Sequence, residues 1–397
     1  MRQKTGPDDF ALFGGPPLFA EPRHVNKPNA APRAAFETYF DQAWATSWFT
    51  NDGPLLQKLE ARLAAWLGVG HCVATCNGTV ALDLTIRALG LSGEVIVPAY
   101  TFVSTANALR LAGLTPVFCD IGAETMNIDA GACGALISEQ TSAVIATHVW
   151  SKPCDTARLQ AVCDAAGIVL LFDAAHAFGA EHLGRRIGGF GHAEIFSLHA
   201  TKVLHSFEGG LVSTDDADLA ADLRLRRNFG FSGADRIDLA GSNAKMSEAH
   251  AAMGLANLDA LEATIAANRR CHDAYAKGLA GIAGLHLRRP APGEVSNYHY
   301  VVAELDTAEF GLSRDSLVEL LFAENVLARR YFHPGGHRMA PHLPESGPPP
   351  SLPVTEAVCE RVIVLPAGAA IALEDVAAIC DLIRLIAQNA PALAARL

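Results

Sequence analysis

Short apolar runs alternate with helical stretches between residues 53 and 173. Leucines recur at every third or fourth position at Leu56, Leu59, Leu63 and Leu67, so the spacing predicts a helix over 53–67. Farther along, the same analysis predicts strands at 72–75, 94–98, 116–120, 142–150 and 168–173, and helices at 79–90, 103–112 and 156–166. This alternation predicts an α/β domain with a largely parallel sheet whose strands are buried on both faces.

The segments outside this alternation predict an N-terminal arm and a second domain. Residues 1–35 are rich in proline and glycine and predict an irregular arm that can cross onto a partner subunit. A long helical stretch at 247–281 is expected to lead into a smaller C-terminal α+β domain. We therefore expect an arm at 1–35, a large domain at 36–260 and a small domain at 261–397.

Composition narrows the class of protein. Half of the 397 residues are apolar and 18% are charged, as in a large globular core. The net charge of −11, without a basic block, argues against nucleic acid as the main partner. Nine scattered cysteines without CxxC pairs favour a reducing cytoplasm over a disulfide framework, and they lack zinc-ribbon spacing. With no apolar signal segment and no membrane-length run, we expect a soluble intracellular protein without a metal site.

Polar residues follow several predicted strands at the point where each strand ends. Asn77, Tyr100, Asp173 and Ser197 all stand at such positions. Ligands of open α/β sheets collect at the carboxyl ends of the strands. The sequence therefore predicts a ligand site on one side of the sheet.

Lys202 is the strongest candidate for chemistry. It lies among Phe196, Leu198, Val203 and Leu204, which favour burial over the exposed position of most lysines. Desolvation lowers the pKa of a buried amine, so that an unprotonated nucleophile exists near neutral pH. A buried lysine about thirty residues after a strand-end carboxylate is the arrangement that a pyridoxal phosphate (PLP) enzyme requires.

The strand-end segment FDAAHAFGA offers two partners for such a cofactor. Asp173 would keep the pyridine nitrogen protonated, although an aspartate at a strand-to-helix turn can also act only as a cap. His176 would hydrogen-bond the phenolic oxygen of the cofactor, and the alternative is a packed core histidine.

The segment 76–80 has the groups that a phosphate needs. Gly78 permits a close approach, Thr79 has a hydroxyl, and the first amides of the predicted helix face the anion. Ser197 adds a second hydroxyl, and Phe102 is placed to stack on a cofactor ring. Taken singly, these residues also suit an ordinary helix start or core packing.

Five motifs in order, CNGTVAL, VPAYTFVST, FDAAHAFGA, FSLHATK…EGG and GSNAKMSEAHAA, resemble the DegT/DnrJ/EryC1/StrS family of sugar aminotransferases. The similarity runs from about residue 48 to the C-terminus. It implies fold type I, the aspartate-aminotransferase-like fold, with a large, mostly parallel sheet domain and a smaller C-terminal α+β domain.

The resemblance also implies roles for individual residues. Lys202 would be the Schiff-base lysine and proton shuttle, Asp173 the pyridinium partner and Phe102 the stacking ring. Gly78, Thr79 and Ser197 would bind the phosphate, and His176 the ring oxygen. Asn243 matches an asparagine that reaches the phosphate across a dimer interface, which implies a homodimer with two shared sites.

Two further segments, 47–60 and 327–339, resemble the branch that aminates nucleotide-linked 4-keto-6-deoxyhexoses. The expected reaction is ping-pong: L-glutamate converts PLP to pyridoxamine phosphate, which then aminates a keto sugar carried on dTDP or another nucleotide. Candidates for substrate contact are Arg329, Arg330, His333, His337 and Lys245, with a solvated arginine pair as the alternative for the first two.

Three departures from the family pattern leave the sugar open. Lys245 stands in place of the usual arginine, His205-Ser206 in place of Asn-Thr, and Ser151-Lys152 in place of Gly-Arg. A 3-keto-sugar or inosose aminotransferase of the same family is therefore an alternative. A sugar dehydratase of this family has a histidine in place of Lys202, and a non-catalytic PLP-binding regulator would not need the lysine–aspartate pair. The nucleotide, the product stereochemistry and the pathway do not follow from the sequence.

Overall fold

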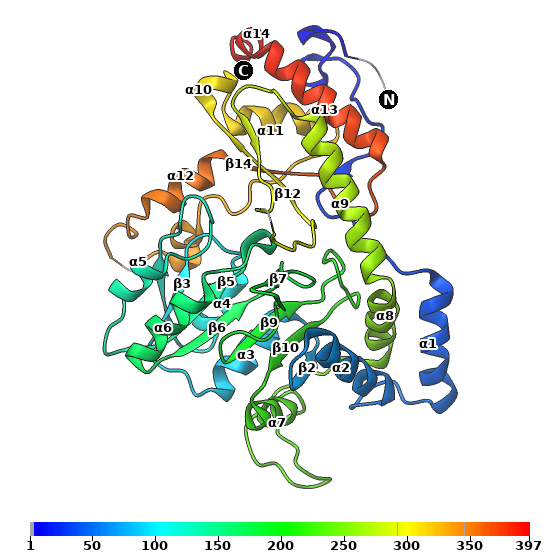
Figure 1. Cartoon of the computed structure of the whole chain (residues 1–397), viewed down its shortest axis with the longest axis vertical. Coiled ribbons are helices and arrows are strands. Elements are labelled where there is room, and N and C mark those ends of the chain that lie inside the picture. The colour runs from blue at the N-terminus through cyan, green and yellow to red at the C-terminus, as the bar shows by residue number, and fades with distance from the viewer. Residues whose placement is uncertain (1–3, 292, 345) are drawn as a thin grey trace.

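The computed structural model describes residues 4–291, 293–344 and 346–397. A seven-stranded sheet forms the centre of the larger part of the molecule (Figure 1). Its strands in spatial order are β2 (His71–Thr75), β10 (Gly210–Thr214), β9 (Ala193–Ser197), β6 (Val169–Asp173), β5 (Thr141–Thr147), β3 (Glu94–Pro98) and β4 (Thr115–Cys119).

Only β10 runs against its neighbours in this sheet, and the pairs from β9 through β4 are all parallel. Successive side chains of a strand point to opposite faces. In β3, Val95 and Val97 join the core on one face and Ile96 the core on the other. Both faces are buried, and the predicted α/β fold is confirmed.

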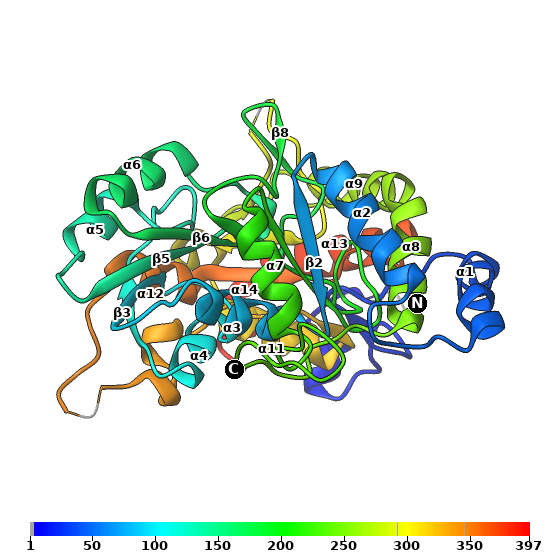
Figure 2. The same cartoon turned by 90° about the horizontal axis from the view of Figure 1, so that it is seen from below.

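Helices cover both faces of the sheet (Figure 2). One face packs against α3 (Gly78–Ala88), α4 (Ser104–Leu111) and α7 (Ala217–Arg226). The other packs against α5 (Ala130–Ala135) and α6 (Thr156–Ala166), and near β2 against α2 (Pro54–Leu67) and α8 (Glu248–Asp259). Helix α1 (Arg33–Thr46) lies on α8 at the outer edge of the molecule.

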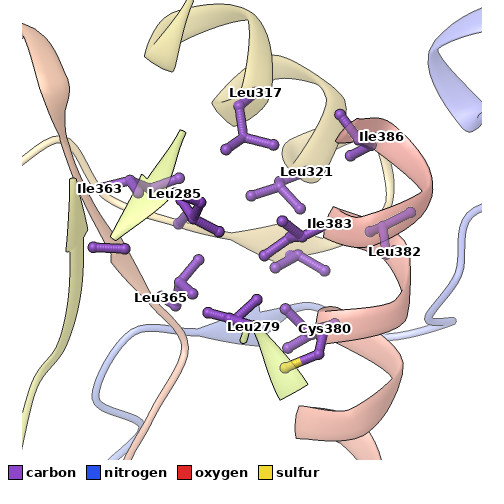
Figure 3. Packing of buried hydrophobic residues seen from close by; sticks show 14 of the residues in the cluster. Leu279, Leu285, Leu317, Leu321, Ile363, Leu365, Cys380, Leu382, Ile383 and Ile386 are labelled. Carbon is purple, nitrogen blue, oxygen red and sulfur yellow. The ribbon is translucent and has the colours of Figure 1, made fainter. Parts of the chain in front are cut away.

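A smaller α+β body follows in the chain. Its three-stranded antiparallel sheet has the order β11 (Leu285–Leu287), β12 (Val301–Leu305) and β14 (Val362–Leu365). Its helices are α9 (Leu261–Gly278), α10 (Thr307–Phe310), α11 (Arg314–Ala323), α12 (Pro353–Arg361), α13 (Leu373–Gln388) and α14 (Ala390–Ala394). Side chains of α11, α13 and the sheet meet in one apolar core, including Leu321, Ile363 and Ile383 (Figure 3).

Several short elements complete the chain. They are η1 (Pro7–Asp9), η2 (Ala11–Phe13), β1 (Arg23–His24), η3 (Val149–Ser151), β7 (Glu181–His182), β8 (Arg185–Arg186), β13 (Val326–Leu327), η4 (Gly336–Arg338) and η5 (Ala340–His342). In the described ranges, no helix combines the length and the apolar character needed to cross a membrane.

The start of the chain packs more closely than the predicted arm suggested. Phe10 and Phe19 are buried in the same core as α11 and α13, and β1 pairs with β13 in parallel. Aromatic side chains can bury a large area even where proline and glycine prevent a regular helix. This segment is therefore part of the small body.

The helical stretch predicted at 247–281 is two helices instead of one. The ladder breaks at Ala260, where α8 ends and α9 begins. Helix α8 lies along the large body, whereas α9 runs up into the small one (Figure 1). The break lets one stretch of helix-forming sequence pack against two different cores.

Candidate active site

A cavity of about 450 Å³ lies at the carboxyl ends of the parallel strands. Its floor comes from residues that end strands of the large sheet or lie within about four positions after them, namely Asn77, Thr101, Phe102, Thr147, Asp173 and Ser197. Its other walls include Asn26, Tyr300, Arg329, Tyr331 and Phe332, which belong to the N-terminal segment and the small body. The cavity is thus closed by two parts of the chain that are far apart in sequence.

Lys202 places its amine in this cavity, in the turn that follows β9. The side chain is half-buried, and Nζ donates a hydrogen bond to Tyr300 Oη at 3.3 Å. Burial lowers the pKa of Lys202 to about 8, while the nearby Asp173 carboxylate favours the charged form. Near neutral pH this amine has a far larger unprotonated fraction than an ordinary lysine.

Asp173 is held by donors from two elements. Thr105 Oγ1, in the first turn of α4, donates to Oδ2 at 2.8 Å, and the Ala175 N–H donates to Oδ1 at 3.1 Å. Thr101 Oγ1 joins this network, at 3.3 Å from Thr105 Oγ1 and 3.1 Å from Thr147 Oγ1. The carboxylate is therefore fixed in one orientation at the cavity floor.

His176 is a buried imidazole in the cavity wall. Burial, together with the charge of Lys202, holds the pKa of His176 well below its ordinary value, so the ring is neutral. The Trp150 N–H donates to Nδ1 at 3.4 Å, which leaves the ring proton on Nε2. The ring also stacks on Trp150, with centroids 5.3 Å apart. It can therefore act as a hydrogen-bond donor in the cavity.

The start of α3 presents hydrogen-bond donors to the cavity beside these groups. Asn77 caps the helix by accepting the Val80 N–H at 2.8 Å, and Gly78 and Thr79 line the cavity. A Cβ on Gly78 would lie 3.3 Å from Ser197, so glycine allows the helix start to approach β9 closely. The amides of the first helical turn and the hydroxyls of Thr79 and Ser197 can together bind a phosphate.

Phe102 projects its ring into the same cavity. The residue is 53% exposed although it follows a buried strand. A large exposed aromatic in a cavity wall is a surface on which a planar ligand can stack. The cavity thus has an amine, a carboxylate, an aromatic face and a helix start.

The substrate candidates separate into those near the cavity and those away from it. Arg329 lines the cavity, and Arg330 and His333 line an adjoining outer pocket that shares Phe102 and Arg329 with it. Arg330 is paired with Asp315 at 3.0 Å, which occupies part of its donor capacity.

Three predicted residues lie elsewhere. His337 is fully buried, with Nε2 3.3 Å from Glu356 Oε1, and lines neither pocket. Asn243 is exposed, and the Lys245 amine donates to Asn228 at 3.0 Å, so neither side chain joins the cavity of its own chain.

Some cavity residues had no signal in the sequence pattern. Tyr300 directly precedes β12, and Asn26 lies in the irregular N-terminal segment. Their places in the cavity depend on how the small body packs over the sheet. Thr105, in contrast, lies within AYTFVST, and its hydroxyl shortly after a strand end could have been predicted to belong to the site.

Among the described residues, no cluster of His, Cys, Asp and Glu is arranged to hold a metal ion. The nine cysteines are free thiols, and Cys76 is the only one of them that is not buried.

The chain matches known proteins over nearly its whole length. The profile of the DegT/DnrJ/EryC1/StrS aminotransferase family matches residues 32–384. The dTDP-4-amino-4,6-dideoxy-D-glucose transaminase of Shigella dysenteriae is 36% identical over 314 residues, which cover 79% of this chain and 85% of that protein. The GDP-perosamine synthase of Vibrio cholerae is 31% identical over 352 residues, which cover 87% and 94% of the two chains.

Solved structures agree with this match. The crystal structure of DesI in the presence of its TDP-sugar product superposes with a TM-score of 0.94 at 46% identity, covering 98% of this chain and 99% of that one. PseC of Helicobacter pylori, an aminotransferase involved in the biosynthesis of pseudoaminic acid, superposes with a TM-score of 0.84 at 25% identity, covering 93% and 99% of the two chains.

Proposed function

Because the chain belongs to the DegT/DnrJ/EryC1/StrS aminotransferase family, we propose that it transfers the amino group of L-glutamate to a 4-keto-6-deoxyhexose carried on a nucleotide, dTDP in the first instance. It is a PLP-dependent sugar aminotransferase. The observation that carries the proposal is the Lys202 amine, whose pKa is lowered to about 8, in one cavity with Asp173.

The residues of the cavity fit PLP. The start of α3 suits its phosphate, the exposed face of Phe102 suits its ring, and Asp173 suits its pyridine nitrogen. When bound, PLP supplies an electron sink for the carbon that gains or loses the amino group. The pyridoxamine phosphate form would bind through the same residues.

Lys202 has two tasks in this proposal. Its unprotonated Nζ would hold the cofactor covalently, and once released it would carry a proton to or from the carbon that exchanges the amine. Its pKa of about 8 suits both tasks, because a general acid–base group works best near the operating pH. Proton transfer by a positioned group of this kind typically contributes about 10²–10⁴ in rate.

The other cavity residues orient the reacting groups. The carboxylate of Asp173, fixed by Thr105, would keep a proton on the facing ring nitrogen. The neutral ring of His176 would donate from Nε2 to the ring oxygen. The small-body wall that carries Tyr300 and Phe332 restricts the access of water to the floor of the cavity.

The proposed sugar substrate rests on the relatives. The Shigella enzyme is named for a dTDP-linked 4-amino sugar and the Vibrio enzyme for a GDP-linked one. Arg329 at the cavity and Arg330 in the outer pocket could meet the diphosphate of such a nucleotide, with His333 beside them. Lys245 and His337 would contribute only through a partner subunit or indirectly.

We also propose a homodimer with shared active sites. Exposed aromatics gather on α1 and the loop after it, where Trp44 is 67%, Trp48 47% and Phe49 43% exposed. Clusters of this kind on a soluble protein usually mark an interface. Asn243, exposed and away from its own cavity, would then serve the site of the other subunit. The free thiols fit the reducing cytoplasm as the site of action.

Borohydride reduction tests the role of Lys202. Reduction of the PLP-loaded enzyme, followed by peptide mass analysis, should find the pyridoxyl group on the peptide that contains Lys202. An adduct on another lysine, or none in protein that contains the cofactor, would contradict the assignment.

A substrate panel tests the reaction. L-glutamate with nucleotide-linked 4-keto and 3-keto sugars, and with an inosose, should give turnover with the 4-keto sugars. Turnover only with a 3-keto sugar or only with the inosose would overturn the choice of substrate.

A further inference from the structure

The N-terminal segment is tied to the small body by a buried charge cluster. Lys4 Nζ donates to the carbonyl oxygens of Asp9 and Pro16, both at 2.6 Å, and to Glu324 Oε1 at 2.9 Å. Glu324, fully buried, also accepts the N–H groups of Ala11 and Leu18. A buried carboxylate with this many donors strongly favours one position of the segment.

Beyond this anchor, backbone pairing directs the chain to the cavity. In the parallel pair of β1 and β13, Arg23 is opposite Val326 and His24 is opposite Leu327. The residues that follow β1 therefore run beside those that follow β13. Asn26 and Arg329 line the same cavity as a result.

Asn26 has two unusual properties at this point. Its backbone is left-handed, with φ of 54°, a conformation that asparagine tolerates better than most residues. Its side chain is only 5% exposed, and Oδ1 has no hydrogen-bond partner among the described residues. A buried polar atom without a partner is costly, and one in the wall of a ligand cavity is explained if the ligand supplies the partner.

The neighbours of Asn26 indicate which ligand group would bind it. A hydrogen bond from the Asn26 side-chain amide acts on the Tyr300 hydroxyl, the same group that accepts from Lys202. Carboxylate or phosphate groups would be drawn to the cation of Arg329 in the same wall. A neutral amide is better suited to a neutral hydroxyl, and the broad terminal torsion of asparagine allows Oδ1 to turn toward it.

We propose that Asn26 is a substrate-binding residue whose side-chain amide accepts a hydrogen bond from a hydroxyl of the keto sugar. This inference rests on the proposed function and adds a specificity residue to it. The N-terminal segment would then have a role in sugar recognition besides its role in the small-body core.

The test separates the two half-reactions in single-turnover experiments followed by cofactor absorbance. Asn26→Gly removes the amide but keeps the left-handed backbone. We expect the half-reaction with L-glutamate, which shares Tyr300 and Lys202 with the sugar half-reaction, to lose less than the sugar half-reaction does. The concentration of dTDP-linked keto sugar that gives half the maximal rate should rise about tenfold, as for the loss of one buried hydrogen bond.

Monodeoxy analogues of the sugar identify the hydroxyl. For the analogue that lacks the partner of Asn26, wild type and Asn26→Gly should bind equally, whereas the other analogues keep the tenfold difference. Such coupling distinguishes a direct contact from a general change of the cavity. If none of the analogues removes the difference between the two proteins, the direct contact is overturned.

Asn325→Gly is the matched control. Asn325 is also left-handed, with φ of 61°, and its Nδ2 holds the N-terminal segment by donating to Phe19 O at 2.8 Å, away from the cavity. The Asn325→Gly variant should have a lower melting temperature, but the sugar concentration that gives half the maximal rate should not rise. If it reproduces the Asn26→Gly effect, loosening of the segment is the cause and the proposal is wrong.

The remaining outcomes are also decisive. If folded Asn26→Gly reaches half its maximal rate at the same sugar concentration as the wild type, the contact is refuted. A larger loss in the glutamate half-reaction than in the sugar half-reaction would assign the amide to the amino donor and refute the proposal. Failure of the wild type to react with L-glutamate at all would refute the proposed function, independently of Asn26.

Discussion

At the scale of single residues, the site depends on opposing effects at Lys202 and Asp173. Burial of the lysine favours its neutral form, and the nearby carboxylate favours its charged form. Burial is the larger effect, and the pKa of Lys202 stays near 8. The carboxylate is in turn oriented by Thr105. Each of these contacts can be altered singly.

The lowered pKa of Lys202 predicts a pH-dependent stability difference for Lys202→Met. The unfolded chain holds this proton up to its ordinary pKa of 10.5, but the native state releases it near pH 8. The native state therefore pays the full cost of the buried charge below pH 8, and this cost disappears as the pH rises to 10.5. Without cofactor, Lys202→Met should be more stable than the wild type by about 3 kcal/mol at pH 7.

Urea unfolding of both cofactor-free proteins at pH 7, 9 and 10 measures this difference, which should shrink with rising pH. An equal difference at all three values would show that the pKa of Lys202 is not lowered.

Thr105→Val tests the support of Asp173. The valine leaves Asp173 Oδ2 without its hydroxyl donor and removes one of the two hydroxyl partners of Thr101, which keeps Thr147. The expected loss of unfolding free energy is about 2 kcal/mol, with PLP affinity reduced about tenfold. Urea unfolding and a cofactor titration measure the two effects. Thr105→Ser keeps the hydroxyl and should behave like the wild type, and equal losses in both variants would contradict the hydrogen-bond explanation.

At the scale of elements, both the local sequence and distant contacts determine where a helix begins and how it is capped. Helix α2 begins at Gly53-Pro54, as expected of a proline in the first turn, but its free N–H groups are capped from elsewhere. Glu248, the first residue of α8, accepts the N–H groups of Leu55 and Leu56 at 2.7 and 3.0 Å. The N-terminal segment is an extreme case, because distant contacts determine its whole path.

Lys4→Met tests the anchor of that segment. It removes three hydrogen bonds and leaves the buried Glu324 charge without its cation, at a cost of about 3 kcal/mol. Urea unfolding at pH 7 measures the loss. The pair of Asp8 and Arg396 is an exposed counterpart in the same segment, so Asp8→Asn should cost less than 1 kcal/mol. Similar losses in both variants would mean that burial of the Lys4 pair is unimportant.

At the scale of the whole molecule, the site is made where the two bodies meet. The sheet contributes the floor, and the small body with the N-terminal segment contributes the walls. The short N-terminal elements η1 and η2 and the C-terminal helix α14 both lie on the small body (Figure 1). We retain the division at 36–260 and 261–397 as a proposal, with the start of the chain assigned to the second part.

The proposed dimer predicts a native mass of about twice 41.9 kDa. Trp44→Glu places a charge in the aromatic cluster of α1 and should shift the protein toward monomer, with loss of turnover as the shared sites separate. Light scattering after size exclusion measures the mass. Leu373→Glu changes an exposed apolar residue of the small body and should leave the mass unchanged. A wild-type monomer with full activity would refute the shared sites.

The local sequence pattern determined most strands of the large sheet, the edge that holds the site, and the family. The apolar runs predicted β2, β3, β4 and β6 within a residue or two, because strands buried on both faces need continuous apolar sequence. Asp173 and Ser197 could be assigned to one edge of the sheet because parallel strands end on the same side. The motifs around Lys202 led to the family, which the comparisons confirm.

Only the tertiary structure decided how the cavity is closed. Lys4 and Glu324 meet across 320 residues of sequence, and Asn26 reaches the cavity through a two-residue strand pair. Tyr300 and Arg329 lie in the wall because the small body packs over the sheet, whereas His337, close to Arg329 in sequence, is buried away from it. Such contacts depend on the packing of whole bodies, and a periodic pattern within one segment carries no information about them.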